Sequence, residues 1–280
     1  MTLISIKNEL LEARQQGYAV LLTDVADIPG VEGMLAAQES RQVAGIIGVY
    51  GGMLKQPNAH ALVRYILQRL SETSLPVSLM LDHGSSLEQC LQAIDWGFSD
   101  VMFDGSSLPF QENCETSRRL VESAHAAGVG VEAELGHVGL GSEYPEYGGK
   151  RKGFTDPLEA KRFAQETGVD FLAVAIGTAH GVYQGEPHVD LELLAEIRRC
   201  VPVPLVLHGG TGLSPAQFQA AIAAGITKIN VATDMFIQAG QRLSQAASDG
   251  ETNYFRLIQV STQAFQERCE LYLDLFSPPK

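Results

Sequence analysis

The chain has 280 residues, of which 45% are hydrophobic and 19% are charged, and its formal net charge is −13 at pH 7. This length suits one α/β barrel or two small domains, and the hydrophobic content supplies a large core. The acidic balance argues against a nucleic-acid partner, because binding to a phosphate backbone requires clustered basic residues.

The N-terminal segment, MTLISIKNELLEARQQG, is predicted to form a charged helix rather than a signal peptide. The sequence contains no apolar stretch of 18 residues, so we expect no membrane partner. The four cysteines are widely spaced and lack the CxxC pairing of a structural metal site. We therefore expect buried, reduced cysteines and a cytoplasmic location.

Eight strand-like runs follow, and they alternate with segments of helical periodicity. The predicted strands are 18–25, 44–50, 76–82, 99–105, 129–135, 169–177, 203–209 and 226–232. Near-continuous apolar strands that alternate with helices indicate a parallel sheet covered on both faces. Eight such units predict an α/β fold, a closed (β/α)8 TIM barrel that forms a single catalytic domain over residues 1–280.

An open, doubly wound sheet is the competing fold, but the Gly-rich phosphate turn that it requires after the first strand is absent. The segment 138–154 is long and rich in glycine, and it follows the fifth strand. We expect it to be a mobile loop at the active site. From residue 253 onward the pattern predicts one additional C-terminal helix.

Polar residues gather at the predicted strand ends, which is where barrel enzymes carry out their chemistry. These residues are Asp24, Tyr50, Asp82, His83, Asp104, Glu134, His180, His208 and Asn230. Core packing does not require hydrogen-bonding or ligating groups at these positions. The concentration therefore predicts a functional site at the carboxyl end of the barrel.

Three of these residues, His83, His180 and His208, each follow an aliphatic run and precede a glycine. A neutral imidazole is the commonest protein ligand for zinc, and a catalytic zinc takes three protein ligands with one position open. Any one of these histidines alone would be better explained as a core residue or a strand cap. The set of three predicts a Zn²⁺ site. His137 lies near the expected mouth, and its role stays undecided.

The carboxylates at the strand ends have two interpretations each. Asp82 could shuttle a proton beside the metal, or it could cap the next helix, although Ser85 or Ser86 could serve as that cap instead. Asp104 and Glu134 could form a second metal or cation position or orient the zinc histidines by hydrogen bonds. Salt bridges at the strand ends are an equally good explanation for this pair.

Two turns have the character of a phosphate site. The sequence His208-Gly-Gly-Thr-Gly212 follows the seventh strand, and Asn230-Val-Ala-Thr233 follows the eighth and opens a helix. Exposed backbone N–H groups and a helix N-terminus bind phosphate without a lysine. Barrels commonly place a phosphate after strands seven and eight. An acidic protein could thus hold a phosphorylated substrate.

With these residues, the chain resembles the class II, zinc-dependent ketose-bisphosphate aldolases of the fructose- and tagatose-bisphosphate group. The resemblance runs from about Pro76 to Asp234, through the motifs LDHGSS, MFDGS, VEAELG, LAVAIGTAHGVY, PLVLHGGTG and KINVAT. The motif NVAT together with AIGTAHG is closer to the tagatose-bisphosphate branch.

The resemblance implies Zn²⁺ on His83, His180 and His208, with Asp82 as proton donor to the aldehyde oxygen. It implies that the dihydroxyacetone phosphate part is held by Gly181, Gly209, Gly210, Thr211, Asn230, Val231, Ala232 and Thr233. A monovalent cation (Na⁺ or K⁺) near the phosphate and a homodimer or homotetramer are also implied. The loop after VEAELG should hold an acidic base, for which Glu143 and Glu146 are the candidates.

Two positions depart from the family pattern. Asp24 stands where the family has an asparagine that contacts substrate, and Tyr50 stands where it has a small hydroxyl residue. A carboxylate or a bulky phenol could weaken binding of a phosphorylated ketose or reshape the pocket.

Three functions stay open from the sequence. The first is an active aldolase on a ketose 1,6-bisphosphate or another ketose 1-phosphate. The second is a non-catalytic partner subunit. The departures at Asp24 and Tyr50 favour it, but the complete set of Asp82 and the three histidines argues against it. The third is a metal-dependent hydrolase on the same barrel, which the paired phosphate turns disfavour.

Overall fold

The computed structural model describes residues 3–144 and 153–277 of the chain. Eight parallel strands close into a barrel in the order β1 to β8, which confirms the predicted TIM barrel. The strands are β1 (Val20–Asp24), β2 (Gly45–Tyr50), β3 (Val77–Gly84), β4 (Asp100–Phe103), β5 (Gly130–Leu135), β6 (Phe171–Val174), β7 (Leu205–Leu207) and β8 (Ile226–Asn230).

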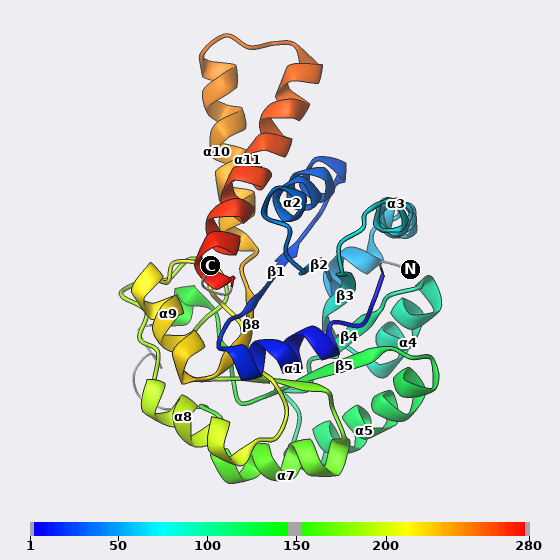
Figure 1. Ribbon diagram of the computed structural model, residues 1–280, viewed down its shortest axis with the longest axis vertical. Helices are drawn as coiled ribbons and strands as arrows, with labels where there is room; N and C mark the ends of the chain where they lie inside the picture. Colours follow the sequence, from blue (N-terminus) through cyan, green and yellow to red (C-terminus); the bar gives the residue numbers. More distant parts are fainter. Residues whose placement is uncertain (1–2, 145–152, 278–280) are drawn as a thin grey trace.

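Helices follow the strands and surround the barrel (Figure 1). They are α1 (Lys7–Gln16), α2 (Ile28–Arg41), α3 (Ala59–Glu72), α4 (Leu87–Trp96), α5 (Phe110–Ala126), α7 (Pro157–Thr167), α8 (Leu191–Cys200), α9 (Pro215–Ala224), α10 (Thr233–Ser248) and α11 (Tyr254–Phe276), with 3-10 turns η1 (Gly51–Lys55) and η2 (Gly141–Glu143). The helix α11 is the additional C-terminal helix that the sequence predicts. Together with α10 it forms a hairpin that projects from the barrel (Figure 1).

Side-chain capping explains where several helices begin. Asp156 accepts hydrogen bonds from the N–H groups of Leu158 and Glu159 at the start of α7. At the start of α9, Ser214 and Gln217 form a capping box around Pro215. Each arrangement satisfies backbone donors that have no partner within the helix, and proline fits the first helical position because it has no N–H to lose.

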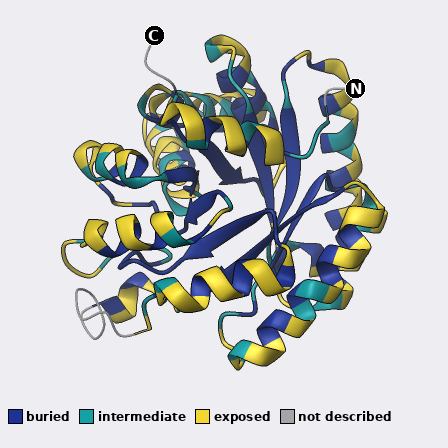
Figure 2. Ribbon diagram, turned by 60° about the horizontal axis from the view of Figure 1, so that its bottom comes forward, coloured by how far each residue is buried: buried dark blue, intermediate teal, exposed yellow. Residues whose placement is uncertain are grey.

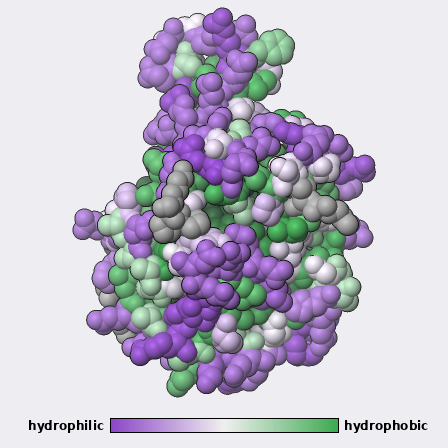
Figure 3. Space-filling view, in the orientation of Figure 1, coloured by the Kyte–Doolittle hydropathy of each residue, from purple (hydrophilic) through white to green (hydrophobic). Residues whose placement is uncertain are grey.

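The exposed residues are found mainly on the outer faces of the helices, whereas the strands are buried (Figure 2). Hydrophilic residues cover much of the projecting hairpin (Figure 3). Within residues 3–144 and 153–277, no helix combines the length and apolar character needed to cross a membrane. The cysteines are free, and Cys90, Cys114 and Cys269 are buried, as the sequence predicts.

Apolar side chains fill the interior of the barrel at the amino ends of its strands. Val20, Leu22, Ile46, Met80, Met102, Phe171, Ala173 and Val206 form this interior cluster with Ile6, Leu10 and Ala13. The last three lie on or next to α1, so this helix packs against the amino-terminal end of the barrel. Since side chains alternate along a strand, the residue two positions after an interior apolar residue also faces the lumen. Polar side chains such as Asp24, Asp82 and His208 follow in this way towards the carboxyl end.

Candidate active site

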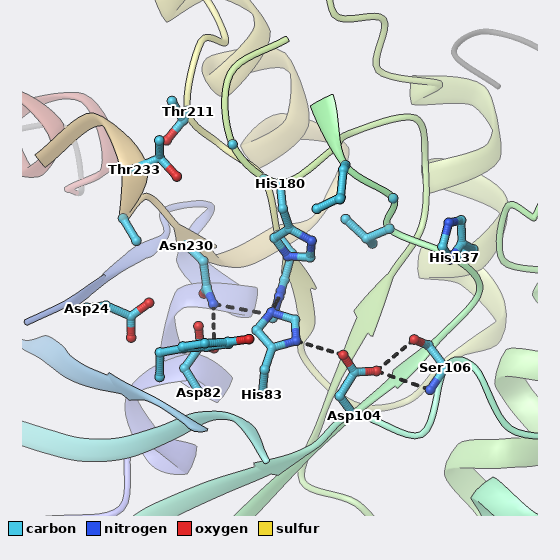
Figure 4. Close-up of a pocket in the computed structure, with 18 of the residues that line it drawn as sticks. Asp24, Asp82, His83, Asp104, Ser106, His137, His180, Thr211, Asn230 and Thr233 are labelled. Atoms are coloured by element: carbon cyan, nitrogen blue, oxygen red, sulfur yellow. Dashed lines mark hydrogen bonds and ion pairs between the residues drawn. The ribbon is translucent and has the colours of Figure 1, made fainter. Parts of the chain in front are cut away.

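A cavity of about 710 Å³ opens at the carboxyl end of the barrel. Nearly every polar residue predicted at a strand end lines it, and Glu134 is buried beneath. The lining includes Asp24, Tyr50, Asp82, His83, Asp104, His137, Glu143, His180, Gly181, His208, Gly209, Thr211, Asn230, Ala232 and Thr233. Figure 4 shows that these side chains converge from several different strands and loops.

The end of β3 brings two consecutive residues into the cavity. The register between β3 and β4 shifts between Leu81 and Gly84, and His83 adopts a left-handed backbone conformation with φ of 51°. This conformation is strained for a residue with a side chain, and such strain is commonly found at functional sites. Because the chain bends here, Asp82 and His83 both line the cavity instead of pointing to opposite faces.

The three predicted metal ligands meet at one point. The ligand atoms of His83, His180 and His208 all lie within 4.8 Å of one another. His83 Nε2 lies 2.8 Å from His208 Nδ1, and the His83 and His180 ring centroids are 4.8 Å apart. His180 Nε2 is buried and has no hydrogen-bond partner. A buried acceptor without a partner is costly, so this nitrogen fits a metal ligand.

Two carboxylates, a half-buried one on Asp104 and a fully buried one on Glu132, fix which nitrogen of two imidazoles faces the predicted metal position. Asp104 Oδ2 lies 2.8 Å from His83 Nδ1, and Glu132 Oε1 lies 2.8 Å from His208 Nε2. An imidazole that donates its proton to a carboxylate presents its other nitrogen as a lone pair. His83 Nε2 and His208 Nδ1 therefore face the metal position. With His180 they offer the three nitrogen donors that suit zinc.

The environment keeps two of the three imidazoles neutral, which is the form that binds a metal. Burial, followed by the nearby His83, lowers the pKa of His180 to about 4. The same two causes lower the pKa of His208 well below its usual value. At His83, burial lowers the pKa, but Asp82 and Asp104 outweigh it and raise the value to about 10.

Asp82 lies beside the histidines and is held by an amide. Asn230 Nδ2 donates a hydrogen bond of 2.9 Å to Asp82 Oδ1 (Figure 4). Asp24, which is 7% exposed, lies on the other side of Asp82, and its Oδ1 has no hydrogen-bond partner. Burial and the Asp82 charge raise the pKa of Asp24 well above its usual value. Gly48 leaves space for this carboxylate, since a Cβ there would lie 2.5 Å from Asp24 Oδ1.

The second metal position considered from the sequence also has a geometric basis. His83, Asp104 and Glu134 form a second group whose ligand atoms lie within 4.8 Å of one another. Asp104 accepts hydrogen bonds from Ser106 and pairs with His83, while Glu134 Oε2 is 3.8 Å from His208 Nδ1. Burial, then Asp104, raises the pKa of Glu134 to about 8. Asp104 and Glu134 both lie next to the histidines predicted to bind zinc.

The two turns predicted to bind phosphate lie side by side at the cavity. Gly209, Thr211, Ala232 and Thr233 line it, and Gly181 lies next to His180. The helix α10 begins at Thr233, and its N-cap residue, Ala232, has no side chain that could cap it, although Thr211 Oγ1 accepts the N–H of Asp234 at 3.3 Å. The other N–H groups of a helix N-terminus can bind an anion. Among the described residues that line this cavity there is no lysine or arginine, so a phosphate here would depend on backbone donors.

Two of the residues expected at the phosphate site have their N–H groups engaged elsewhere. Gly210 donates its N–H to the carbonyl of Asn230 at 3.0 Å, and Val231 donates to the carbonyl of Leu22 at 3.0 Å. Neither residue lines the cavity. Their amides hold the turns in shape, which leaves contact with a ligand to the residues around them.

The loop after β5 is anchored to the loop that carries His180, one of the predicted metal ligands. Gly141 donates its N–H to the carbonyl of His180 at 2.7 Å, and His180 donates to the carbonyl of Gly139 at 2.8 Å. This pairing places Glu143 at the cavity. Glu146, the other acid considered as a base, lies outside the described residues, as do residues 145–152 of the loop predicted to be mobile.

Sequence reasoning missed three residues that shape the site. Glu132 and Lys228 are both 0% exposed and lie inside the barrel, and Tyr183 bridges two loops. The signal for the first two was present in the strands. Each is a charged residue in an apolar run, two positions before a strand-end polar residue, and so on the same face.

Comparisons with known proteins agree with this geometry. The family model for class II fructose-bisphosphate aldolase matches residues 4–278. The chain is 42% identical over 237 residues to the fructose-bisphosphate aldolase of Geobacillus stearothermophilus, covering 84% of this chain and 82% of that protein. It is 37% identical over 257 residues to the fructose-bisphosphate aldolase of Staphylococcus aureus, covering 91% and 89% of the two chains.

Solved structures give the same result. The YdjI aldolase from Escherichia coli K12 superposes with a TM-score of 0.89 at 30% identity, over 99% of this chain and 98% of that one. A putative fructose-1,6-bisphosphate aldolase from Coccidioides immitis gives 0.87 at 28% identity, over 96% and 94%. The chain therefore belongs to the class II fructose-bisphosphate aldolase family. It is an aldehyde-lyase of a family that is generally zinc-dependent.

Proposed function

We propose that the protein catalyses the reversible, zinc-dependent cleavage of a ketose 1,6-bisphosphate to dihydroxyacetone phosphate and glyceraldehyde 3-phosphate. The observation that carries the proposal is the convergence of nitrogen atoms from His83, His180 and His208 within 4.8 Å, beside Asp82. The substrate is tagatose or fructose 1,6-bisphosphate. The motifs AIGTAHG and NVAT favour the tagatose branch, whereas the named relatives are fructose-bisphosphate aldolases.

The chain's own residues divide the work between binding and proton transfer. His83 Nε2, His208 Nδ1 and His180 would hold zinc, which when bound stabilises negative charge that develops on the substrate oxygens. Asp82 takes the proton of the C4 hydroxyl during cleavage and returns it to the aldehyde oxygen during condensation. Glu143, on the loop anchored to His180, exchanges the proton at the carbon of dihydroxyacetone phosphate.

The phosphate of the dihydroxyacetone phosphate half would lie in the two turns after β7 and β8. Gly181, Gly209, Thr211, Ala232 and Thr233 surround this space, and the α10 N-terminus favours negative charge. A monovalent cation, Na⁺ or K⁺, would offset the acidic surroundings. Gly210 and Val231 would hold the two turns in shape through their backbone hydrogen bonds to Asn230 and Leu22.

The remaining properties follow the family resemblance. We propose a single catalytic domain over residues 1–280, assembled as a homodimer or homotetramer in the cytoplasm. A phosphorylated ketose is the partner, with no nucleic acid or membrane involved.

A different ketose 1-phosphate is the second candidate substrate, and one observation favours it. Asp24 has a buried oxygen without a partner beside Asp82, and Tyr50, which is 50% exposed, lines the same side of the cavity. Neither side chain would attract a second phosphate. The non-catalytic partner subunit considered from the sequence is not supported, because the chain belongs to an aldolase family and such a subunit has no need for three converging imidazoles.

The test combines metal analysis with a substrate panel. We expect about one zinc per chain, and we expect chelation to abolish cleavage and re-addition of zinc to restore it. The zinc-loaded protein is then given dihydroxyacetone phosphate with a panel of phosphorylated and unphosphorylated aldehydes. Full turnover after exhaustive metal removal would contradict the proposal, and the aldehyde that reacts fastest identifies the substrate.

A further inference from the structure

A chain of buried polar contacts runs beneath the active site from β5 to β3. Glu132 Oε2 lies 2.9 Å from Lys228 Nζ, and Lys228 Nζ donates to Asn230 Oδ1 at 2.8 Å. Asn230 Nδ2 then donates to Asp82 Oδ1 at 2.9 Å. Glu132 also contacts His208 through its other oxygen at 2.8 Å. This series of contacts therefore links His208, a proposed zinc ligand, to Asp82, the proposed proton-transfer residue.

Lys228, the lysine in this series of contacts, is fully buried. Lys228 is 0% exposed, and its neighbour in the contact, Glu132, is also 0% exposed. Removing two charges from water is costly, and a buried ion pair is weak evidence of a stabilising role. The pair thus calls for an explanation other than stability.

The contact with Asn230 supplies that explanation. An amide group can be turned by half a rotation, which exchanges its oxygen and its nitrogen with little change in shape. Lys228 has only donors, so it requires the amide oxygen to face it. The amide nitrogen is then obliged to face Asp82. Lys228 and Asp82 thus select the same orientation of the amide, and without the lysine only the contact with Asp82 would hold Asn230 in place.

We propose that Lys228 is a positioning residue that acts on Asp82 through the orientation of the Asn230 amide. The role rests on the proposed aldolase function, since it concerns the residue that handles the proton of the C4 hydroxyl. Lys228 lies beneath the cavity and does not line it, so it does not touch the reacting atoms.

The test variant replaces both members of the ion pair, Glu132→Gln with Lys228→Met, so that no unpaired charge stays buried. Thr227→Val is the matched control. Thr227 precedes Lys228 on β8, is 1% exposed, and bonds the carbonyl of Leu205 at 3.1 Å instead of facing the lumen. Both proteins are loaded with zinc, and the metal content per chain is measured.

Two rates separate positioning of Asp82 from general damage. Proton exchange at the carbon of dihydroxyacetone phosphate needs no aldehyde and hence no Asp82, whereas cleavage needs both. Both rates are measured at saturating zinc, so that the weaker zinc binding expected of Glu132→Gln does not lower them. Under these conditions we expect the double variant to lose about 10- to 100-fold in kcat for cleavage, in the range of general acid–base effects, while exchange changes by less than about threefold. In an Asp82→Asn background the same double change should cost less than about twofold. An equal loss in both rates, or an equal loss in the Asp82→Asn background, would overturn the inference.

A third measurement does not depend on the reaction. In the wild type, the side-chain amide protons of Asn230 should show slow solvent exchange and a nuclear magnetic resonance shift typical of a strong hydrogen bond. Both features should be lost in the double variant and kept in Thr227→Val. Unchanged Asn230 resonances in the double variant would overturn the inference, whatever the substrate. Absence of dihydroxyacetone phosphate exchange in the wild type would instead overturn the proposed function.

Discussion

The phenol of Tyr183 donates a hydrogen bond of 2.8 Å to the carbonyl of Gly209, the residue after His208. The same oxygen accepts the N–H of Ala179, the residue before His180, at 2.7 Å. One hydroxyl group therefore joins the loops that carry two of the three proposed zinc ligands. It also fixes the first glycine of a proposed phosphate turn.

Removal of this hydroxyl group should loosen the site more than the fold. We expect Tyr183→Phe to lower zinc affinity by roughly tenfold, the lower end of the range for residues that orient metal ligands. The free energy of unfolding should fall by only about 1 kcal/mol, the usual contribution of one hydrogen bond. Competition with a chelator and denaturant unfolding measure the two effects. Tyr254→Phe, at a 71% exposed position, is the control and should change neither.

Glu132 should matter to the metal because it fixes the orientation of His208. Glu132→Gln keeps the size of the side chain but can present an N–H to His208 Nε2 in place of an acceptor. We expect zinc affinity to fall by about 10- to 100-fold. Zinc titration against a competing chelator checks this, with the exposed Glu196→Gln as control. Wild-type affinity in Glu132→Gln would show that His208 does not need the carboxylate.

Asp24 should make substrate binding depend on pH. Its pKa is raised by burial and by Asp82, so the neutral form persists to higher pH than in an ordinary aspartate. As the pH rises through that value, the added negative charge should repel a phosphorylated ketose. We expect the wild-type KM to rise on the order of tenfold, equivalent to about 1.4 kcal/mol, and Asp24→Asn to abolish the rise. Measuring KM of both proteins over a pH series tests this prediction. Parallel KM profiles for the wild type and Asp24→Asn would contradict a role of Asp24.

Asp100 should make folding stability depend on pH at a distance from the active site. Burial raises its pKa to about 7, although hydrogen bonds from Ser78, Ser5, Ile6 and Ser99 act in the opposite direction. The folded state then binds a proton that the unfolded state releases near pH 4. Its contribution is therefore complete below about pH 4 and is lost as the pH rises to about 7.

This loss should amount to at most about 4 kcal/mol, from a shift of about three pKa units. We expect the stability of Asp100→Asn to fall less steeply between pH 4 and pH 7 than that of the wild type. Urea unfolding at several pH values in this window measures the difference. Asp95→Asn, at an exposed position, should keep the wild-type slope. A wild-type slope in Asp100→Asn would show that Asp100 is already ionised in this window.

The barrel could be predicted from the sequence because each strand is a distinct apolar run and each helix has its own periodicity. All eight predicted strands are present, with differences only at their ends. The end of β3 shows why such differences matter. The strand continues to Gly84 through a register shift, and nothing in the letters LDHG specifies the left-handed backbone at His83.

The site could be predicted only where its residues follow a strand directly. His83, His180 and His208 meet as expected because parallel strands end at one edge. The contacts between Glu132, Lys228 and Asn230 join strands that are distant in sequence, so no local pattern reveals them. Tyr183 was missed for a similar reason, since its role depends on how two loops approach each other.

The buried pair of Glu132 and Lys228 also bears on how the protein binds and loses its metal. The carboxylate that contacts His208 is itself paired with the ammonium group of Lys228. Part of the surroundings of His208 is thus supplied by the polypeptide alone. We therefore expect removal and re-addition of the metal to leave the barrel folded, so that metal exchange is a local event.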